Sequence, residues 1–284
     1  MELTNENYFS QEMNMKYMGA SSFKDFMACE THALASVMGL CEEKKTPSLL
    51  VGSYVDAYFS NEMEQFKAQN PQIFKKDGTL LKDFEKANEI IKAIEQDNLM
   101  MMYLGGKKQV IMTGKIAGVD FKIKVDSLLE DVIVDQKIMA SIRELVWQYD
   151  EETKRNKQID FVEAFGYDIQ GAIYQEIVRQ NTGKKLPFVL AVATKEDGCE
   201  RMLIQIDQEY LDRALELVKD LAPRYDAIKN GLVEPKSCGK CPICRAKRNC
   251  VEVVSYKELF GKEDKNEENA NWIIERAKIS KDQY

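Results

Sequence analysis

The sequence predicts an α/β fold in which strands in the middle of the chain are flanked by helices. Two observations carry this prediction. Hydrophobic and polar residues alternate across 118–129 and 131–138, which is the period of a β-strand. Across 160–182, hydrophobic residues recur every three or four positions, which is the period of an amphipathic helix.

The other elements follow from the same periodicities, and turn residues mark several of their ends. Asn70-Pro71 indicates a turn between two helices, and Glu196-Asp197-Gly198 indicates a hairpin between two strands. In chain order, the pattern predicts helices near 21–38, 48–62 and 82–98, a strand near 108–115, a short helical stretch near 139–148, strands near 187–195 and 200–206, and a helix near 208–230.

The chain is long enough to bury one sizeable core. Its 284 residues are 44% hydrophobic, which favours one domain with appendages over two equal domains. We expect an N-terminal arm at 1–20, a single domain at 21–254 and a charged, partly helical tail at 255–284 around Trp272. The N-terminus is polar and acidic, and no apolar run reaches about 18 residues, so we expect a cytoplasmic protein without a membrane span.

The two short strands carry an acidic pattern with a lysine. Lys124-Val125-Asp126 is followed by Asp135-Gln136-Lys137, with Glu130-Asp131 as the expected turn between them. Residues two apart in a strand share a face, so Asp135 and Lys137 point the same way. If the strands form a hairpin, Asp126 can lie on that face beside them.

These residue types suit a metal-dependent nuclease. Asp126 and Asp135 supply carboxylates, and the backbone carbonyl of Gln136 can add a third oxygen for magnesium. The metal would polarise a phosphate, and Lys137 would orient the attacking water or stabilise charge on the phosphate. The pattern alone is weak, because a solvated hairpin with ordinary surface charges is the alternative.

The helix at 160–182 adds a second motif. Tyr167, Gln170 and Tyr174 share one of its faces, in the order Gln-x-x-x-Tyr. With both motifs, the chain resembles the PD-(D/E)XK nuclease superfamily, in particular the branch of RecB-type nuclease domains, phage lambda-type exonuclease and exonuclease VIII. The resemblance covers roughly residues 20 to 250. It implies a restriction-endonuclease-like core, in which a mixed central β-sheet is flanked by α-helices.

The resemblance also implies roles for individual residues. Gln170 and Tyr174 would complete the catalytic set of Asp126, Asp135 and Lys137. In the element Val51-Gly52-Ser53-Tyr54-Val55-Asp56, Asp56 stands where a histidine is usual in the family. An aspartate can also ligate magnesium or manganese, so Asp56 is a candidate metal ligand with Asp126, Asp135 and Gln136.

The function implied by the resemblance is degradation of one strand of duplex DNA from its end, in phage-type recombination. The resemblance also implies a single-strand annealing protein as partner and a ring-shaped homo-oligomer as assembly. Two alternatives stay open: an iron–sulfur nuclease of the CRISPR-associated or helicase-linked type, and a nucleic-acid-binding module that has lost catalysis. The set Asp126, Asp135 and Lys137 argues against the second alternative.

Clustered cysteines indicate a further metal site, because thiols in a cytosolic chain bind metal more often than they form disulfides. Cys238, Cys241, Cys244 and Cys250 could hold zinc. The segment also resembles the iron–sulfur staple of AddB-type and CRISPR-associated nucleases. That resemblance implies a 4Fe–4S cluster on Cys29, Cys241, Cys244 and Cys250, with Cys238 as an extra thiol. A reduced cluster without metal is the third possibility, and Cys41 and Cys199 are expected to be packing residues.

The only histidine, His32, limits the possible chemistry. One histidine argues against a Ser-His-Asp hydrolase, a histidine-ligated zinc enzyme and histidine-based acid–base catalysis. His32 falls in the predicted helix that contains Cys29, so a structural or surface role is expected for it.

Charge gives a mixed indication about nucleic acid. The net charge of −7 argues weakly against binding, but basic residues gather locally in two places. A solubilising surface is the alternative at both, and it is favoured for Lys184-Lys185 alone. The candidate DNA contacts are Lys184, Lys185, Lys240, Arg245, Lys247 and Arg248.

Overall fold

The structure, a computed structural model, describes residues 2–41, 46–150 and 153–260. The chain divides into two units, Met1–Cys244 and Arg245–Tyr284. The expected N-terminal arm therefore belongs to the first unit, and the division comes before the boundary expected at 254. Trp272 and the helix expected around it lie outside the described residues.

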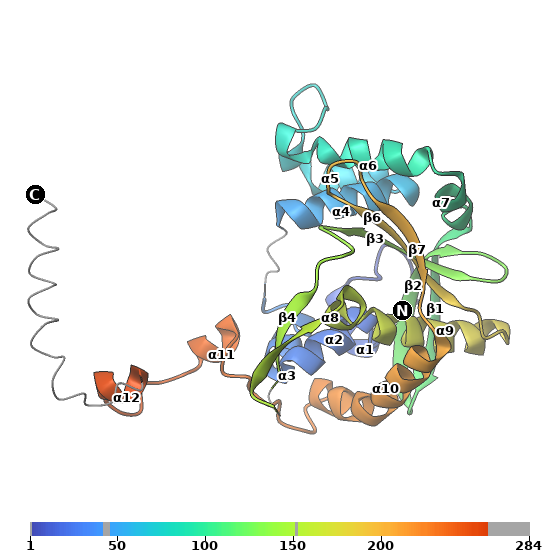
Figure 1. Cartoon of the computed structure of the whole chain (residues 1–284). Coiled ribbons are helices and arrows are strands. Elements are labelled where there is room, and N and C mark those ends of the chain that lie inside the picture. Colours follow the sequence, from blue (N-terminus) through green and yellow to red (C-terminus); the bar gives the residue numbers. More distant parts are fainter. Residues whose placement is uncertain (1, 42–45, 151–152, 261–284) are drawn as a thin grey trace, which may run out of the picture. The chain divides into compact units, whose positions relative to one another are not determined.

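A five-stranded sheet crosses the first unit (Figure 1). Its order is β1-β2-β3-β6-β7, and only the pairing of β3 with β6 is parallel. The predicted mixed sheet is thereby confirmed. Its strands are β1 (Lys107–Ile116), β2 (Val119–Leu128), β3 (Ile133–Met139), β6 (Phe188–Thr194) and β7 (Arg201–Gln205).

Helices cover both faces of this sheet (Figure 1), because its strands alternate apolar residues toward each side. Ile133 packs into one core cluster and its neighbour Val134 into the other. The first face holds α2 (Ala20–Ala28), α3 (Glu30–Val37), α9 (Tyr167–Thr182) and α10 (Gln208–Lys229); the second holds α4 (Pro47–Phe59), α6 (Lys86–Glu95) and α7 (Asn98–Tyr103).

The shorter elements connect these layers. They are α1 (Gln11–Lys16), α5 (Met63–Gln69), η1 (Pro71–Ile73), η2 (Lys82–Phe84), β4 (Val146–Asp150), β5 (Arg155–Ile159), α8 (Phe161–Phe165), α11 (Pro242–Ala246) and α12 (Tyr256–Phe260). The predicted turn at Asn70-Pro71 is confirmed, since η1 starts at Pro71 directly after α5. The hairpin at Glu196-Asp197-Gly198 is confirmed between β6 and β7.

Two predicted helices are divided. The helix expected at 160–182 is interrupted by Gly166, whose φ of +60° ends α8 and is open to glycine at little cost. The helix expected at 21–38 is interrupted by the extended residue Cys29, with φ −165° and ψ 110°. On both sides of each break, the helices contribute residues to the same core cluster, among them Phe23, Ala33, Phe161 and Ile169.

The prediction of a short helix near 139–148 is wrong. Residues from Val146 form β4 instead, which pairs with β5 in a separate two-stranded sheet. Trp147 and Tyr149 alternate along β4, and aromatic residues favour strands. A short apolar run does not separate helix from strand by periodicity alone, which is why the sequence misled here.

The N-terminal residues are not a loose arm. Tyr8 and Met13 are buried, and Met18 forms a parallel bridge with Phe121 of β2. The buried ammonium group of Lys122 donates to the carbonyl oxygen of Tyr8 and, at 2.7 Å, to Oδ1 of Asn14. These bonds fix the first residues of the chain on the sheet.

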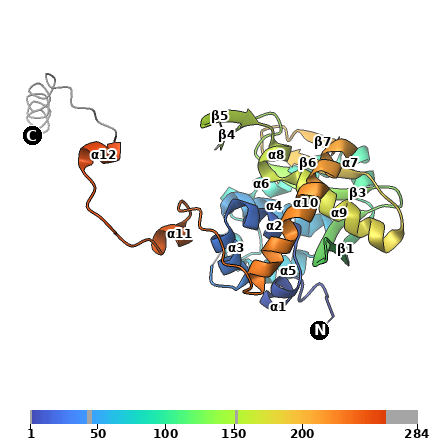
Figure 2. The same ribbon diagram turned by 90° about the horizontal axis from the view of Figure 1, so that it is seen from below.

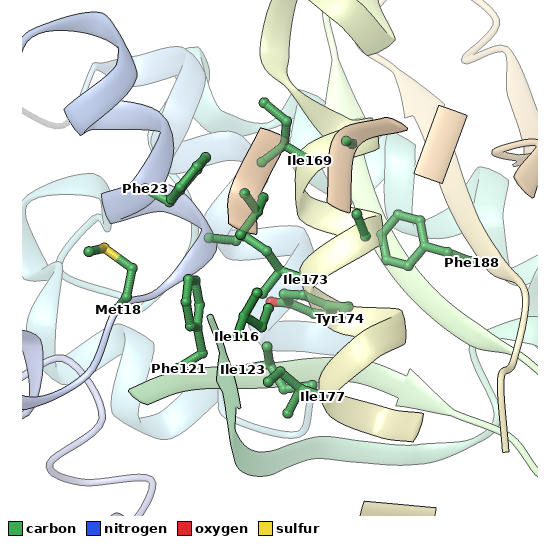
Figure 3. Packing of buried hydrophobic residues seen from close by; sticks show 14 of the residues in the cluster. Met18, Phe23, Ile116, Phe121, Ile123, Ile169, Ile173, Tyr174, Ile177 and Phe188 are labelled. Carbon is green, nitrogen blue, oxygen red and sulfur yellow. The ribbon is translucent and has the colours of Figure 1, made fainter. Parts of the chain in front are cut away.

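Helix α9 packs closely on both β6 and α10 (Figures 2 and 3). The close approach is made at Gly171, where an added Cβ would lie 2.6 Å from Phe188 and 2.8 Å from Leu211. Ile173 and Tyr174 flank this contact and fill the core between α9 and the sheet. Real Cβ atoms do not approach so closely, so any larger residue must displace the helix.

Gly171→Ala is expected to lower the free energy of unfolding by about 1–3 kcal/mol, because overpacking outweighs alanine's better helix propensity. Gly52→Ala in α4 is the matched control, since its Cβ would meet Ile138 at an ordinary 3.7 Å. That change should be neutral or stabilise by up to about 1 kcal/mol. Urea unfolding measures both, and equal effects of the two substitutions would contradict the packing argument.

Candidate active site

Strands β2 and β3 part where their acidic residues lie. The ladder between them joins Leu128 with Ile133 and Ser127 with Val134, and then ends. Asp126 is the next residue on β2, and its Oδ2 accepts a hydrogen bond of 2.9 Å from the backbone N–H of Gln136. The carboxylate thus takes a donor that the ladder leaves unpaired, and it is held at the opening between the strands.

Asp135 is buried on the adjoining strand and has two partners. Its Oδ1 accepts a hydrogen bond of 2.6 Å from Nε2 of Gln170 on α9. Its Oδ2 forms an ion pair with Lys137, two residues along the same face of β3. The aspartate is therefore fixed from both sides, by the helix that carries Gln-x-x-x-Tyr and by the lysine of Asp-x-Lys.

A third carboxylate comes from the opposite layer. Asp56 lies near the end of α4, where Ser60 Oγ donates to its Oδ1 at 3.5 Å. Burial raises the pKa of Asp56, and the charge of Asp135 raises it further. Burial, together with Asp135 and Asp56, raises the pKa of Asp126 to about 8. Asp56, Asp126 and Asp135, the three carboxylates proposed from the sequence as metal ligands, are thus near enough for their charges to influence one another.

Lys137 responds to the same charges in the opposite sense. Burial disfavours its ammonium form, but the neighbouring Asp135 and Asp126 outweigh burial and raise its pKa above the usual value. Its ammonium group also lies 5.5 Å from the ring centre of Tyr167. Lys137 is thus a fixed positive charge beside two carboxylates.

The donor set suits a hard divalent cation such as magnesium or manganese. Burial is the main cause of the raised pKa values of Asp56 and Asp126, and the charge of Lys137 offsets it only in part. In the ranges that the structure describes, the grouped metal-ligand side chains are the cysteines, and the three aspartates do not form such a group without a metal. Magnesium usually keeps several waters, which can occupy the remaining positions.

Tyr174, the tyrosine of the Gln-x-x-x-Tyr motif, supports the strand that carries Asp126. The Tyr174 hydroxyl donates a 3.0 Å hydrogen bond to the backbone carbonyl of Lys124, and its ring packs on Phe188 (Figure 3). Burial raises the pKa of Tyr174 well above its usual value, so the hydroxyl keeps its proton. Tyr174 therefore holds β2 in place two residues before Asp126.

Several neighbours of the site were missed from the sequence. Lys24 of α2 lies near Lys137: burial and then the charge of Lys137 lower the pKa of Lys24. The ammonium group of Lys124 lies 4.0 Å from Oε2 of Glu62. Burial, and then the charge of Asp126, raises the pKa of Tyr8. Lys124 could have been identified, because it shares a strand face with Asp126, whereas nothing in the sequence singles out the other three.

A second group of ligand-type side chains consists of four cysteines. Cys29, Cys238, Cys241 and Cys244 place their sulfur atoms within 4.8 Å of one another, and all four belong to the first unit. Cys29 Sγ lies 3.9 Å from Cys241 Sγ and 3.5 Å from Cys244 Sγ. This differs from both predicted ligand sets, each of which contained Cys250. Cys250 is exposed and belongs to the second unit.

The carboxylate of Glu30 places the cysteine segment against Cys29. Arg224 of α10 donates to both Glu30 oxygens at 2.7 Å, and the N–H of Lys236 donates to Oε2 at 2.6 Å. Thr31 adds a bond of 3.0 Å from its hydroxyl to the Lys236 carbonyl. The chain just before Cys238 is thereby tied to the residues just after Cys29.

Two of these thiols are disposed to ionise. Backbone N–H groups of Cys241 and Lys240 donate to Cys238 Sγ at 3.3 and 3.4 Å and lower the pKa of Cys238. Several hydrogen bonds, the one from Ser237 above all, lower the pKa of Cys244 to about 6. A backbone hydrogen bond from Cys244 lowers the pKa of Cys241, but burial and the neighbouring thiols outweigh it and raise that pKa to about 11. Thiolates are the metal-binding form of cysteine, so the group has the chemistry of a metal site.

The other two cysteines differ in burial. Cys199 is buried, in keeping with a packing residue, whereas Cys41 is half-buried. No metal-ligand group in the described parts of the chain includes either residue.

The predicted DNA-contacting residues are distributed over both units. Lys184 pairs with Glu130 at 3.7 Å and Lys185 with Asp212 at 2.9 Å, so acidic neighbours offset both charges. Lys240 is exposed within the cysteine segment of the first unit. Arg245, Lys247 and Arg248 are exposed in the second unit.

Stability of the metal-free protein should depend on Asp126. Its folded pKa lies near 8, above the unfolded value, so between about pH 4 and pH 8 the unfolded chain ionises first. Stability therefore falls as pH rises through this window, by up to about 1.4 kcal/mol per pH unit from this residue. Asp126→Asn removes the dependence, and urea unfolding with a chelator at pH 5 and pH 8 measures it.

The control for this experiment is Asp120→Asn, on the same strand, whose side chain is 47% exposed and paired with Lys115. The gain in stability of Asp126→Asn over the wild type should grow from pH 5 to pH 8. The same gain at both pH values would show that Asp126 ionises normally.

Comparison with known proteins agrees with this geometry. Residues 19–247 match the family described as "PDDEXK-like domain of unknown function (DUF3799)". The chain is also similar to a crystal structure named "Putative exonuclease" from Eubacterium rectale: the two are 46% identical, with a TM-score of 0.84, over 93% of this chain and 100% of that one. No curated protein matches the sequence. Among the described residues, no helix is both long and apolar enough to cross a membrane. The chain belongs to the PDDEXK-like family, and so to the PD-(D/E)XK nuclease superfamily.

Proposed function

We propose that this nuclease-family protein is a metal-dependent exodeoxyribonuclease that hydrolyses phosphodiester bonds from the ends of duplex DNA. The observation that carries the proposal is the meeting of Asp126, Asp135 and Lys137 where β2 and β3 part. Burial, together with the charges of Asp135 and Asp56, raises the pKa of Asp126, and strongly shifted pKa values are typical of functional sites.

Each residue of the site has a proposed task. Asp126 and Asp135 bind the divalent cation, with Asp56 and the backbone carbonyl of Gln136 as further oxygen donors. When bound, magnesium or manganese acts as a Lewis acid toward the scissile phosphate and acidifies a nearby water. Gln170 holds Asp135 in its ligating orientation, and Tyr174 fixes the strand that carries Asp126.

Lys137 is proposed to act on the reacting groups themselves. Its ammonium group stays charged beside Asp135, so it can orient the attacking water and stabilise negative charge on the phosphate. DNA is thus the proposed partner at this site, and the basic residues Lys240, Arg245, Lys247 and Arg248 are proposed phosphate contacts. The resemblance to exonuclease VIII supports a role in phage-type recombination beside a single-strand annealing protein, with a homo-oligomer as the proposed assembly.

One nuclease assay tests the proposal. With magnesium or manganese, the protein should degrade linear duplex DNA and spare closed circular DNA, and a chelator should stop the reaction. Lys137→Ala should lower the rate at least about 100-fold, because it removes a group that acts in the transition state. Calorimetric titration of the same variant with manganese should still show binding, because the carboxylates remain.

Lys184→Ala is the matched lysine control, since Lys184 is 56% exposed and pairs with Glu130 on the surface. It should keep the wild-type rate. Cleavage of closed circles at the same rate as linear DNA would replace the exonuclease proposal with an endonuclease. Undiminished cleavage by Lys137→Ala would refute the assigned site.

We also propose that Cys29, Cys238, Cys241 and Cys244 hold a tightly bound metal centre. Four thiolates around one zinc ion, with bonds of about 2.3 Å, lie about 3.8 Å apart. The sulfur atoms here lie within 4.8 Å, which favours a single ion. A 4Fe–4S cluster is the alternative, supported by the C-x2-C-x2-C spacing of Cys238, Cys241 and Cys244 and by the family resemblance. That alternative also keeps open an iron–sulfur nuclease of the helicase-linked or CRISPR-associated type.

Metal analysis of anaerobically purified protein distinguishes these centres. One zinc per chain without colour supports the single ion, whereas four irons with absorption near about 400 nm supports the cluster. Cys29→Ser and Cys238→Ser should each lose the metal, while Cys250→Ser and Cys41→Ser should keep it. Loss of metal in Cys250→Ser together with retention in Cys238→Ser would restore the iron–sulfur ligand set expected from the sequence, namely Cys29, Cys241, Cys244 and Cys250.

A further inference from the structure

Phe9 presents an aromatic ring to solvent next to the candidate active site. The ring is 72% exposed, although the neighbouring Tyr8 is buried. Phe9 packs edge-on against Tyr8, with ring centres 4.9 Å apart and planes at 80°. The ammonium group of Lys124 lies 5.1 Å from the centre of the Phe9 ring. Tyr8 thus supports the Phe9 ring on one side, while most of Phe9 remains exposed to solvent.

The backbone at Phe9 is held in place as well. Ser10 caps α1, and its Oγ accepts a hydrogen bond from the N–H of Met13 at 3.3 Å. The carbonyl of Phe9 accepts a 3.3 Å hydrogen bond from Asn14, and the carbonyl of Tyr8 accepts one from Lys122. An exposed aromatic on a fixed backbone loses little freedom on binding, which favours recognition of a ligand.

Two side chains connect Phe9 to the surroundings of Asp126. Tyr8 supports the ring, and the charge of Asp126 adds to burial in raising the pKa of Tyr8. Lys124 lies on the same strand face as Asp126, and its ammonium group is 5.1 Å from the centre of the Phe9 ring and 4.0 Å from Oε2 of Glu62. The exposed ring therefore lies on the side of the site where a DNA end could approach the aspartates.

We propose that Phe9 is a stacking platform for the nucleobase adjoining the scissile phosphate. This inference rests on the proposed nuclease function and assigns the subsite that receives the DNA end. Stacking on an aromatic ring tolerates every sequence, because each base offers a π face, which suits an enzyme that must pass along DNA of any sequence.

The test separates binding from chemistry. The probe is a linear duplex with 2-aminopurine at its terminal nucleotide, and calcium replaces magnesium so that the DNA remains intact. Phe9→Ala should weaken binding about 10-fold and remove the fluorescence quenching caused by stacking, whereas Phe9→Trp should retain both. In cleavage assays with magnesium, Phe9→Ala should raise KM about 10-fold and leave kcat within about 2-fold.

Tyr210→Ala provides the matched control, because Tyr210 is a 46% exposed aromatic on α10 that also lies beside a cation, Arg213. It should behave as the wild type. Wild-type binding and KM in Phe9→Ala would overturn the inference while leaving the nuclease function intact. A changed oligomeric state of Phe9→Ala in size-exclusion chromatography, with normal DNA binding, would assign the ring to a protein contact instead. A wild-type protein that neither binds nor cleaves the probe would refute the nuclease function itself.

Discussion

The hydrogen bond from the Gln136 N–H to the Asp126 carboxylate is the constraint on which the candidate site depends. Strands β2 and β3 stop pairing just before it, and an unpaired backbone donor at this depth would be costly. Asp126 satisfies that donor and so stabilises the opening of the sheet. Only because the strands part there can Asp56 approach from one layer and Gln170 from the other.

The apolar cores on both sides of this opening offset the energetic cost of the buried carboxylates. Burial, and then the charges of Asp135 and Asp56, raise the pKa of Asp126, so its ionised carboxylate destabilises the metal-free fold. Apolar cores on both faces of the sheet supply the opposing stability. Tyr174 contributes both to the stability of the core and to the geometry of the site. Its ring belongs to one core cluster, and its hydroxyl group donates a hydrogen bond to the strand that carries Asp126.

The sequence predicted the elements whose periodicity is set by a buried face. The strands around Asp126 and Asp135 and the helix carrying Gln170 were foreseen, because alternation and turn residues define their register. Contacts distant in sequence could not be foreseen in the same way. The position of Cys238 beside Cys29 depends on Glu30 and its bonds to Arg224 and Lys236, which no local pattern encodes. The place of Phe9 depends on the buried Lys122 in the same way.

The cysteine group unites residues from near the beginning of the chain with residues that follow the last helix on the sheet, α10. During synthesis on the ribosome, Cys29 emerges early and must wait for Cys238, Cys241 and Cys244. At typical elongation rates of about 5–20 residues per second, this delay is on the order of 10 to 40 s. In that interval a lone thiol is open to oxidation, and the four-cysteine group can assemble only once the strands and helices of the first unit have been made. Its completion thus marks a finished nuclease domain.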